Sequence, residues 1–263
     1  MIHSTAIIHP SAHIEDAVTV GPYAVVGADT IIRRGASIGA HTLVECADIG
    51  EEAVIFNNAS IGTAPQDLKY KGEKTRLFLG KRTVVREFVT LNRGTTASEK
   101  TMIGEDCLIM AYAHVAHDCV VGNNVIMANA ATLGGHSVVG DRAVLGGLVA
   151  VHQFTRIGAL AMIGGGAMVS LDILPFAQAQ GDRAKLAGLN MVGMRRQGLS
   201  REAIDEVKSA YRVLFLSAIS MEEAIDQLEA SSPSAEVRTM IDFIRSSHRG
   251  ICRPARKEDT EEL

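Results

Sequence analysis

Residues 103–169 read IGEDCLIMAYAHVAHDCVVGNNVIMANAATLGGHSVVGDRAVLGGLVAVHQFTRIGALAMIGGGAMV, and this stretch decides the fold. An aliphatic residue or Met recurs at every sixth position, namely Ile103, Ile109, Val115, Val121, Met127, Leu133, Val139, Leu145, Val151, Ile157, Ile163 and Val169. A small or slim residue usually follows four positions later, as at Cys107, Ala113, Cys119, Val125, Ala131, Ser137, Ala143, Val149, Thr155, Ala161 and Ala167. Two inward positions in each unit favour a short strand and a turn. Three units would close one triangular coil of about 18 residues, and coils would stack as in other solenoids.

The same period extends toward the N-terminus, through Ile8, Ile14, Val20, Val26, Ile32, Ile38 and Val44, and after a slip of one residue through Ile49, Ile55 and Ile61, then Leu79, Val85 and Leu91. The sequence therefore predicts a mainly β protein, a parallel β-helix of hexapeptide repeats over residues 1–184. Gly often follows the aliphatic residue, as at Gly104 and Gly122. We expect these glycines to supply the positive φ angles that tight corners need.

Two segments leave the register, residues 62–78 and residues 94–101. Both are polar, and the first is punctuated by Gly and Pro. Insertions in a solenoid form external loops, which often carry binding groups. Tolerated decoration of the surface is the alternative interpretation.

The six-residue pattern ends after Pro175, and helical spacing begins at Ser200, a predicted N-cap. Ser220 and Glu223 form a predicted capping box, and Pro233 predicts a further helix start. We therefore expect a small C-terminal α-helical domain over residues 185–263.

Composition excludes several classes of protein. The formal net charge is −4 and the pI is near 6.1, so no overall basic field would attract nucleic acid. No signal peptide and no apolar run long enough for a membrane span is evident, so we expect a cytoplasmic protein that is not integral to a membrane. None of the four cysteines forms a close CxxC pair, and Cys107 and Cys119 should point inward as buried thiols in a reducing compartment.

Four histidines gather in the best-ordered repeats: His114, His117, His136 and His152. Asp118 and His136 are separated by three complete hexads and should stack on adjacent coils, with His117 beside Asp118. An imidazole next to a carboxylate is a candidate general base. Two alternatives remain open at this point: a zinc site like that of β-helical carbonic anhydrases, and a non-catalytic scaffold with solvated histidines.

Several segments carry a closer resemblance: QDLKYKGEKTR (66–76), FVTLNRGT (88–95), AHVAHDCVVGN (113–123), NAATLGGHSVVGD (129–141), AVHQF (150–154) and MRRQGLSREAI (194–204). Together they resemble the UDP-N-acetylglucosamine O-acyltransferases, the hexapeptide-repeat family that catalyses the first step of lipid A biosynthesis. The resemblance implies left-handed coils. It also implies an acyl carrier protein as donor of a 3-hydroxyacyl chain, a UDP-amino-sugar as acceptor, a homotrimer, and neither a metal nor an organic cofactor.

The resemblance also implies site residues. His117 would take the proton from the sugar 3-position, Asp118 would orient its ring, and the amide of Gly135 would stabilise the oxyanion. The implied substrate-binding residues are Gln66, Asp67, Lys69, His114, His136, His152, Gln153, Asn190 and Arg196. Gly165 would leave the acyl groove open for a chain near C14.

Asn92 is also an implied substrate-binding residue, and it stands where the family usually has a substrate-contacting His. Asn cannot become cationic, so a 3-amino analogue of the sugar nucleotide remains an alternative acceptor to the 3-hydroxyl. For the acidic carrier protein we expect a local basic patch, with Arg195, Arg196, Arg201, Lys208 and Arg212 as candidates.

Overall fold

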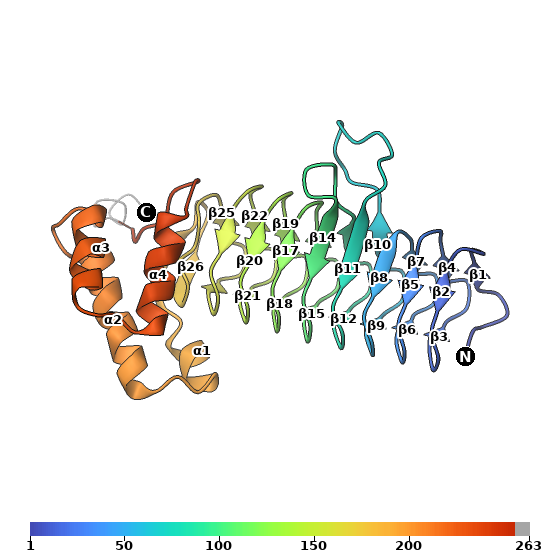
Figure 1. Cartoon of the computed structure of the whole chain (residues 1–263), viewed down its shortest axis with the longest axis horizontal. Helices are drawn as coiled ribbons and strands as arrows, with labels where there is room; N and C mark the ends of the chain where they lie inside the picture. Colours follow the sequence, from blue (N-terminus) through green and yellow to red (C-terminus); the bar gives the residue numbers. More distant parts are fainter. Residues whose placement is uncertain (256–263) are drawn as a thin grey trace.

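The computed structural model describes residues 1–255, and in this part of the chain short strands stack into a long prism that ends in helices (Figure 1). One sheet contains β1 (Ile7–Ile8), β4 (Val25–Val26), β7 (Leu43–Val44), β10 (Ser60–Thr63), β13 (Thr90–Asn92), β16 (His114–Val115), β19 (Thr132–Leu133), β22 (Ala150–Val151) and β25 (Met168–Val169). A second contains β2 (His13–Ile14), β5 (Ile31–Ile32), β8 (Ala47–Ile49), β11 (Arg76–Leu79), β14 (Lys100–Ile103), β17 (Val120–Val121), β20 (Val138–Val139) and β23 (Arg156–Ile157). The third contains β3 (Thr19–Val20), β6 (Ser37–Ile38), β9 (Val54–Ile55), β12 (Val84–Val85), β15 (Leu108–Ile109), β18 (Ile126–Met127), β21 (Val144–Leu145), β24 (Met162–Ile163), β26 (Ala177–Gln180) and β27 (Lys185–Leu189).

Hydrogen-bonded neighbours within the prism are parallel and lie one coil apart. On the first sheet His114 pairs with Thr132, and Thr132 pairs with Ala150. Each step spans three complete hexads, as the repeat predicts. The structure thus confirms the expected fold class, a mainly β parallel helix of six-residue units followed by a small helical part.

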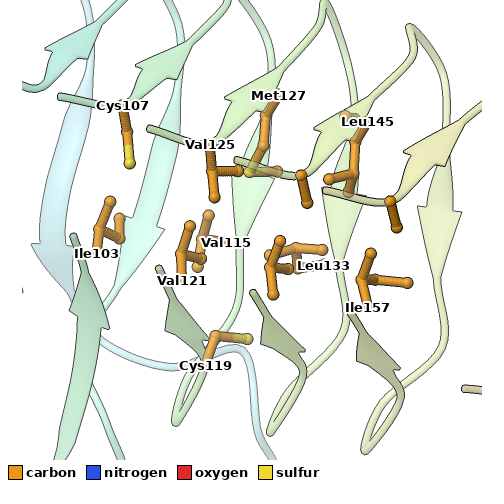
Figure 2. Packing of buried hydrophobic residues seen from close by; sticks show 14 of the residues in the cluster. Ile103, Cys107, Val115, Cys119, Val121, Val125, Met127, Leu133, Leu145 and Ile157 are labelled. Carbon is orange, nitrogen blue, oxygen red and sulfur yellow. The ribbon is translucent and has the colours of Figure 1, made fainter. Parts of the chain in front are cut away.

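Both inward tracks of the repeat form the core (Figure 2). Ile109, Val115, Met127 and Leu133 on the aliphatic track are fully buried, and so are most of the small residues between them. Cys119 is fully buried and Cys107 nearly so, which confirms their predicted inward orientation. A narrow interior of this kind accepts aliphatic side chains and thiols more readily than rings.

The glycines have a different role from the one expected. Most positive φ angles at the coil corners belong to other residues, such as Asp118 (φ 60°), His136 (φ 61°) and Phe154 (φ 65°). Gly104 has no positive φ; an ideal Cβ there would lie 2.5 Å from the carbonyl oxygen of Gly122 on the next coil. The expectation was therefore wrong. These glycines permit close approach between stacked backbones, while the stacking holds the corners in the left-handed region.

The two expected loops project from the same side of the prism (Figure 1). The longer one connects β10 to β11 and the shorter one connects β13 to β14, so part of residues 62–78 belongs to strands. The turn after β13 holds the longer loop, since Arg93 Nε donates to the hydroxyl of Tyr70 (2.9 Å) and Thr75 Oγ1 donates to the carbonyl of Gly94 (2.6 Å).

The coils end in an antiparallel pair, β26 with β27. Four helices follow in the described residues: α1 (Met191–Arg196), α2 (Arg201–Leu216), α3 (Met221–Ala230) and α4 (Ala235–Arg245). The N-cap at Ser200 and the capping box of Ser220 and Glu223 are confirmed. Ser234, the residue after Pro233, is the N-cap of α4. None of the helices described is long and apolar enough to cross a membrane.

The helical part packs against the last coils. The guanidinium of Arg156 lies 4.3 Å from the ring centre of Phe243 and donates to the carbonyl of Ser246, while Asp172 forms a bridge with Ile251. The expected domain boundary at 184/185 falls between the paired strands β26 and β27 and stays a prediction. Residues 256–263 of the expected helical domain lie outside the described residues.

Candidate active site

Residues one coil apart form two adjacent columns at one corner of the prism. His136 N donates to the carbonyl of His117 (3.0 Å), and Phe154 N donates to the carbonyl of Gly135 (2.9 Å). One column is therefore His117, Gly135 and Gln153, and its neighbour is Asp118, His136 and Phe154. The predicted stacking of Asp118 and His136 on adjacent coils is confirmed.

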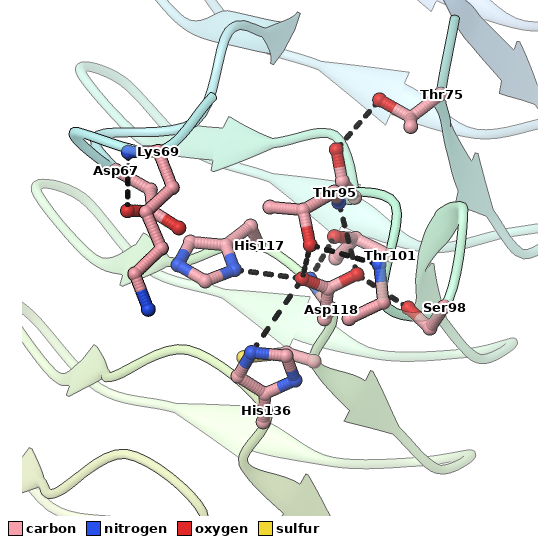
Figure 3. Close-up of polar contacts among 12 residues, drawn as sticks. Asp67, Lys69, Thr75, Thr95, Ser98, Thr101, His117, Asp118 and His136 are labelled. Carbon is pink, nitrogen blue, oxygen red and sulfur yellow. Dashed lines mark hydrogen bonds and ion pairs between the residues drawn. The ribbon is translucent and has the colours of Figure 1, made fainter. Parts of the chain in front are cut away.

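His117 and Asp118 form a hydrogen-bonded dyad. Nδ1 of His117 lies 2.7 Å from Oδ2 of Asp118 (Figure 3). An ionised carboxylate can only accept, so Nδ1 carries the proton and Nε2 keeps its lone pair in the neutral ring. The His117 side chain is 15% exposed, so Nε2 is the atom that can meet a reactant.

Asp118 is held by four donors. Thr95 donates from its backbone N to Oδ1 (2.9 Å) and from its hydroxyl to Oδ2 (2.7 Å), Ser98 donates to Oδ1, and His117 completes the set. The side chain has no exposed surface, and burial alone would raise its pKa. The hydrogen bonds from Ser98, Thr95 and His117 outweigh burial and lower the pKa of Asp118 to about 2. The dyad therefore contains a permanent anion at neutral pH.

Two further histidines line the corner. The ring of His136 stands edge-on to His117 at 5.2 Å between centres and stacks on Phe154 at 4.4 Å. Its Nε2 lies 3.7 Å from Oδ2 of Asp118. His114 projects from β16, where Nδ1 lies 2.7 Å from the hydroxyl of Thr90. Burial, together with the neighbouring His117, lowers the pKa of His114, so this ring is neutral near pH 7.

Gly135 lies under the imidazole of His117. An ideal Cβ at this position would lie 2.7 Å from Cε1 and 2.8 Å from Nε2 of the ring. The amide N–H of Gly135 makes no hydrogen bond within residues 1–255. A backbone donor without a protein partner, on the residue that lies against the imidazole of His117, suits stabilisation of a developing oxyanion.

The three side chains His117, Asp118 and His136 place possible ligand atoms within 4.8 Å of one another. Their chemistry does not fit a metal ion. Both oxygens of Asp118 already accept hydrogen bonds from protein donors, and Nδ1 of His117 is one of those donors. A metal would have to displace these partners from a buried carboxylate.

His152 and Gln153 lie one coil beyond Gly135 and are exposed at the same corner, with Nδ1 of His152 3.0 Å from the carbonyl of Gln153. Gln66, Asp67 and Lys69 belong to the long loop, where Asp67 accepts from the backbone N of Lys69 (3.0 Å). No hydrogen bond or ion pair joins these three loop residues to the dyad within the part of the chain that the structure describes.

Two asparagines of the predicted set are engaged in structural contacts. Asn92 is 3% exposed, and its Nδ2 donates to Thr63 Oγ1 (3.2 Å) and to the carbonyl of Ala64 (3.1 Å), at the start of the long loop. Asn190 caps α1 by accepting from the backbone N of Gly193 (2.9 Å), and its Nδ2 donates to the carbonyl of Leu160 (2.8 Å). Arg196, in the last turn of α1, is exposed.

Gly165 lies at a different corner from His117. Its neighbour Gly166 donates to the carbonyl of Gly147 (2.8 Å), so Gly165 belongs to the column of Gly147. An ideal Cβ on Gly165 would approach only Gly147, with its oxygen at 3.3 Å. A single chain therefore does not bring Gly165 and the dyad into one cleft.

Sequence reasoning missed Thr95, Ser98, Thr101 and Phe154. Thr101 Oγ1 accepts from the backbone N of Asp118 (2.9 Å), and Phe154 covers His136. Phe154 follows His136 by one coil, as His136 follows Asp118, so the coil period was a signal that could have found it. Thr95 and Ser98 lie in an insertion, where the period gives no register.

Comparisons with known proteins agree along the whole chain. The profile described as "Udp N-acetylglucosamine O-acyltransferase; Domain 2" matches residues 172–252, and that of the bacterial transferase hexapeptide matches residues 11–46 and 100–135. An acyl-[acyl-carrier-protein]--UDP-N-acetylglucosamine O-acyltransferase from Myxococcus xanthus is 48% identical over 96% of this chain and 99% of that relative. One from Thermodesulfovibrio yellowstonii is 49% identical with the same coverage. The solved UDP-N-acetylglucosamine acyltransferase from Campylobacter jejuni superposes with a TM-score of 0.93 at 38% identity, over 97% of this chain and 100% of that one.

Proposed function

Because the chain belongs to the UDP-N-acetylglucosamine O-acyltransferase family, we propose that it transfers a 3-hydroxyacyl chain from acyl carrier protein to the 3-hydroxyl of UDP-N-acetylglucosamine, the first step of lipid A biosynthesis. One observation supports this chemistry most directly. Asp118 binds Nδ1 of His117 and leaves Nε2 free, with Gly135 packed against the imidazole.

In the proposed mechanism, Nε2 of His117 removes the proton as the sugar oxygen attacks the thioester carbon. The anion of Asp118 stabilises the imidazolium that forms. The Gly135 amide donates to the oxyanion of the tetrahedral intermediate. His117 then protonates the departing thiolate, so the ring returns to its neutral state when the ester has formed.

The remaining predicted residues are proposed to bind substrates. His114, His136, His152 and Gln153 share the corner of the dyad and would contact the sugar and its diphosphate. Gln66, Asp67, Lys69 and Arg196 would act from the long loop and from α1. We assign Asn92 and Asn190 an indirect part, because their amides hold the start of that loop and the N-terminus of α1.

A homotrimer is proposed because the site is incomplete in one chain. The dyad and Gly165 lie at different corners of the prism, so a groove that contains both requires a neighbouring subunit. Cyclic symmetry would bring one corner of each chain against another corner of the next, so that the dyad of one chain would face the Gly165 column of its neighbour. The open surface at Gly165 would then admit an acyl chain near C14.

The carrier protein is proposed to dock on the basic surface of α1 and α2. Arg201 and Lys208 face Asp205, at 3.9 and 2.7 Å, whereas Arg195, Arg196 and Arg212 form no ion pair within the described residues. Unpaired arginines suit an acidic partner. Four free cysteines in the described chain support a reducing compartment, and we propose the cytoplasm.

The decisive experiment replaces His117 with Ala and measures transfer from 3-hydroxyacyl carrier protein. Loss of several orders of magnitude is expected, with the trimer and the melting temperature preserved. Retained activity would remove His117 as the base. Stoichiometric zinc in the purified protein would support the alternative zinc-enzyme interpretation instead.

The acceptor is tested in the same assay with the 3-hydroxy and 3-amino sugar nucleotides side by side. Asn92 is the observation that keeps the amino acceptor in consideration, because a neutral amide stands where the family usually has an imidazole. Preference for the hydroxyl would show that Asn92 is a neutral replacement. Preference for the amine would change the product from an ester to an amide.

A further inference from the structure

The short loop at residues 94–101 turns inward onto one side chain, Asp118 (Figure 3). Thr95 donates from both its backbone N and its hydroxyl, and that hydroxyl in turn accepts from the backbone N of Ala97 (3.2 Å). The hydroxyl of Ser98 lies between Oδ1 of Asp118 and the carbonyl of Lys100. It has one proton, and the carboxylate is the nearer and charged acceptor. The segment that interrupts the six-residue repeat therefore supplies hydrogen-bond donors to one buried carboxylate, that of Asp118.

An anion at this position needs such donors. The side chain of Asp118 has no exposed surface, and a buried carboxylate without partners would be strongly destabilising. His136 and Phe154 occupy the position of Asp118 in the next two coils, where the turns between β19 and β20 and between β22 and β23 carry no inserted loop. The insertion lies between β13 and β14, at the same corner and one coil before the carboxylate that stands next to an imidazole.

We propose that Thr95 and Ser98 are positioning residues of the acyl transfer, which hold the Asp118 carboxylate so that it binds Nδ1 of His117 and directs Nε2 toward the acceptor. This inference rests on the proposed function, in which His117 is the base. Neither residue touches the substrate in this role. Each fixes one or both oxygens of Asp118, and Asp118 fixes the ring.

The donors also control how strongly the anion acts on His117. Four donors share the charge of Asp118, and His117 is one of them. When Thr95 and Ser98 lose their hydroxyls, more of the charge is directed at the imidazole, which favours the imidazolium. The other ionisable groups that face His117 are His114 and His136 on the neighbouring strand and coil, and the long loop carries Asp67 and Lys69 on the same side.

The test compares Thr95→Val, Ser98→Ala and the double variant with the wild-type full-length enzyme. We expect kcat to fall roughly tenfold to a hundredfold in the double variant, with KM for the sugar nucleotide nearly unchanged. The acid limb of kcat/KM should move to higher pH by roughly one unit. Thr95→Ser should restore both values. Thr96→Val is the matched control, because Thr96 is the exposed neighbour and makes no hydrogen bond to Asp118.

A measurement without turnover separates this inference from the proposed function. In ¹⁵N-histidine-labelled protein, His117 should show the Nδ1–H tautomer in the wild type, and its titration midpoint should rise in the double variant. An unchanged midpoint and tautomer in a folded double variant would overturn the positioning role, whatever the activity. Suppose that His117→Ala remains active while the midpoint of His117 still rises in the double variant of Thr95 and Ser98. That pair of results would show that His117 is not the base, and that Thr95 and Ser98 nevertheless position the dyad.

Discussion

Gly135 and His117 lie one coil apart and in contact, and the position at 135 has no room for a side chain while the imidazole of His117 occupies its present place. A Cβ would lie 2.7 Å from Cε1 of that ring, so Gly135→Ala must displace His117 from Asp118. We expect at least a hundredfold loss of kcat/KM with little change in melting temperature, because the ring can rotate outward. Steady-state kinetics and thermal unfolding measure both effects.

Gly147→Ala is the control for this experiment. Gly147 occupies the corresponding slot of the repeat two hexads later, where an ideal Cβ would meet only the carbonyl of Asn129 at 3.4 Å. It should retain most of the activity. Equal losses of kcat/KM in the two variants would show that glycine at this position is needed for the packing of the coils and not for the placement of the imidazole.

The stability of the protein should depend on Asp118 at low pH. Its pKa is about 2 in the folded protein, below the ordinary value near 3.9 of an unfolded chain. A depressed pKa contributes stability above the unfolded value, and the contribution is lost as the pH falls from about 4 to about 2. Its size is on the order of 2 kcal/mol.

Asp118→Asn should therefore lose less unfolding free energy than the wild type between pH 5 and pH 3. Urea titrations at one fixed protein concentration measure the difference, since assembly also contributes to stability. An identical pH dependence in the two proteins would contradict the depressed pKa.

The cysteines should resist alkylation in the native protein. Burial raises the pKa of Cys119 to about 12 and that of Cys252 to about 11, and it also raises the pKa of Cys107. At pH 8 these thiols remain protonated and covered, so iodoacetamide should modify them only after unfolding. Cys46 is half-buried and should react first. Mass spectrometry of native and urea-treated samples gives the order, and rapid native labelling of Cys119 would contradict its inward orientation.

The cap of α1 should matter to binding as well as to stability. Asn190→Ala removes the N-cap and the bond to Leu160, which should cost about 1 to 2 kcal/mol of unfolding free energy. Because α1 carries Arg196, KM for the sugar nucleotide should also rise several-fold. Ser234→Ala removes the N-cap of α4 and should lower stability alone. An unchanged KM for the sugar nucleotide in Asn190→Ala would show that the position of α1 does not affect substrate binding.

Much of the fold could be predicted because inward residues repeat every six positions, as at Val115 and Val121. The period also placed Asp118 beside His136. It could not place Thr95 or Ser98, since an insertion has no register and its path depends on hydrogen bonds to Asp118. The function of Gly104 was misjudged for a related reason: close contact between coils is a property of stacking, and one coil's sequence does not display it.

The relation of Asn92 and Asn190 to the site was also beyond the sequence. Both carry amides that suit substrate contact, and resemblance assigned them that part. The structure engages each with backbone at the base of a segment that bears other predicted residues. Which partner a buried amide selects depends on tertiary neighbours such as Ala64 and Leu160, which are distant from the two asparagines in sequence.

Because the coils stack in register, the number of coils in the prism can change without moving the residues of the dyad relative to one another. The dyad lies between β16 and β17, and the strands from β1 to β6 lie in coils that contribute no predicted site residue. Each coil contacts mainly the coils directly before and after it. During evolution the N-terminal end can therefore gain or lose whole turns of the prism without disturbing the dyad, provided that the change comes in complete units. A change of one residue within a coil must instead be absorbed locally, as between Val44 and Ile49, where β8 restores the pairing of Ile32 with Ile49.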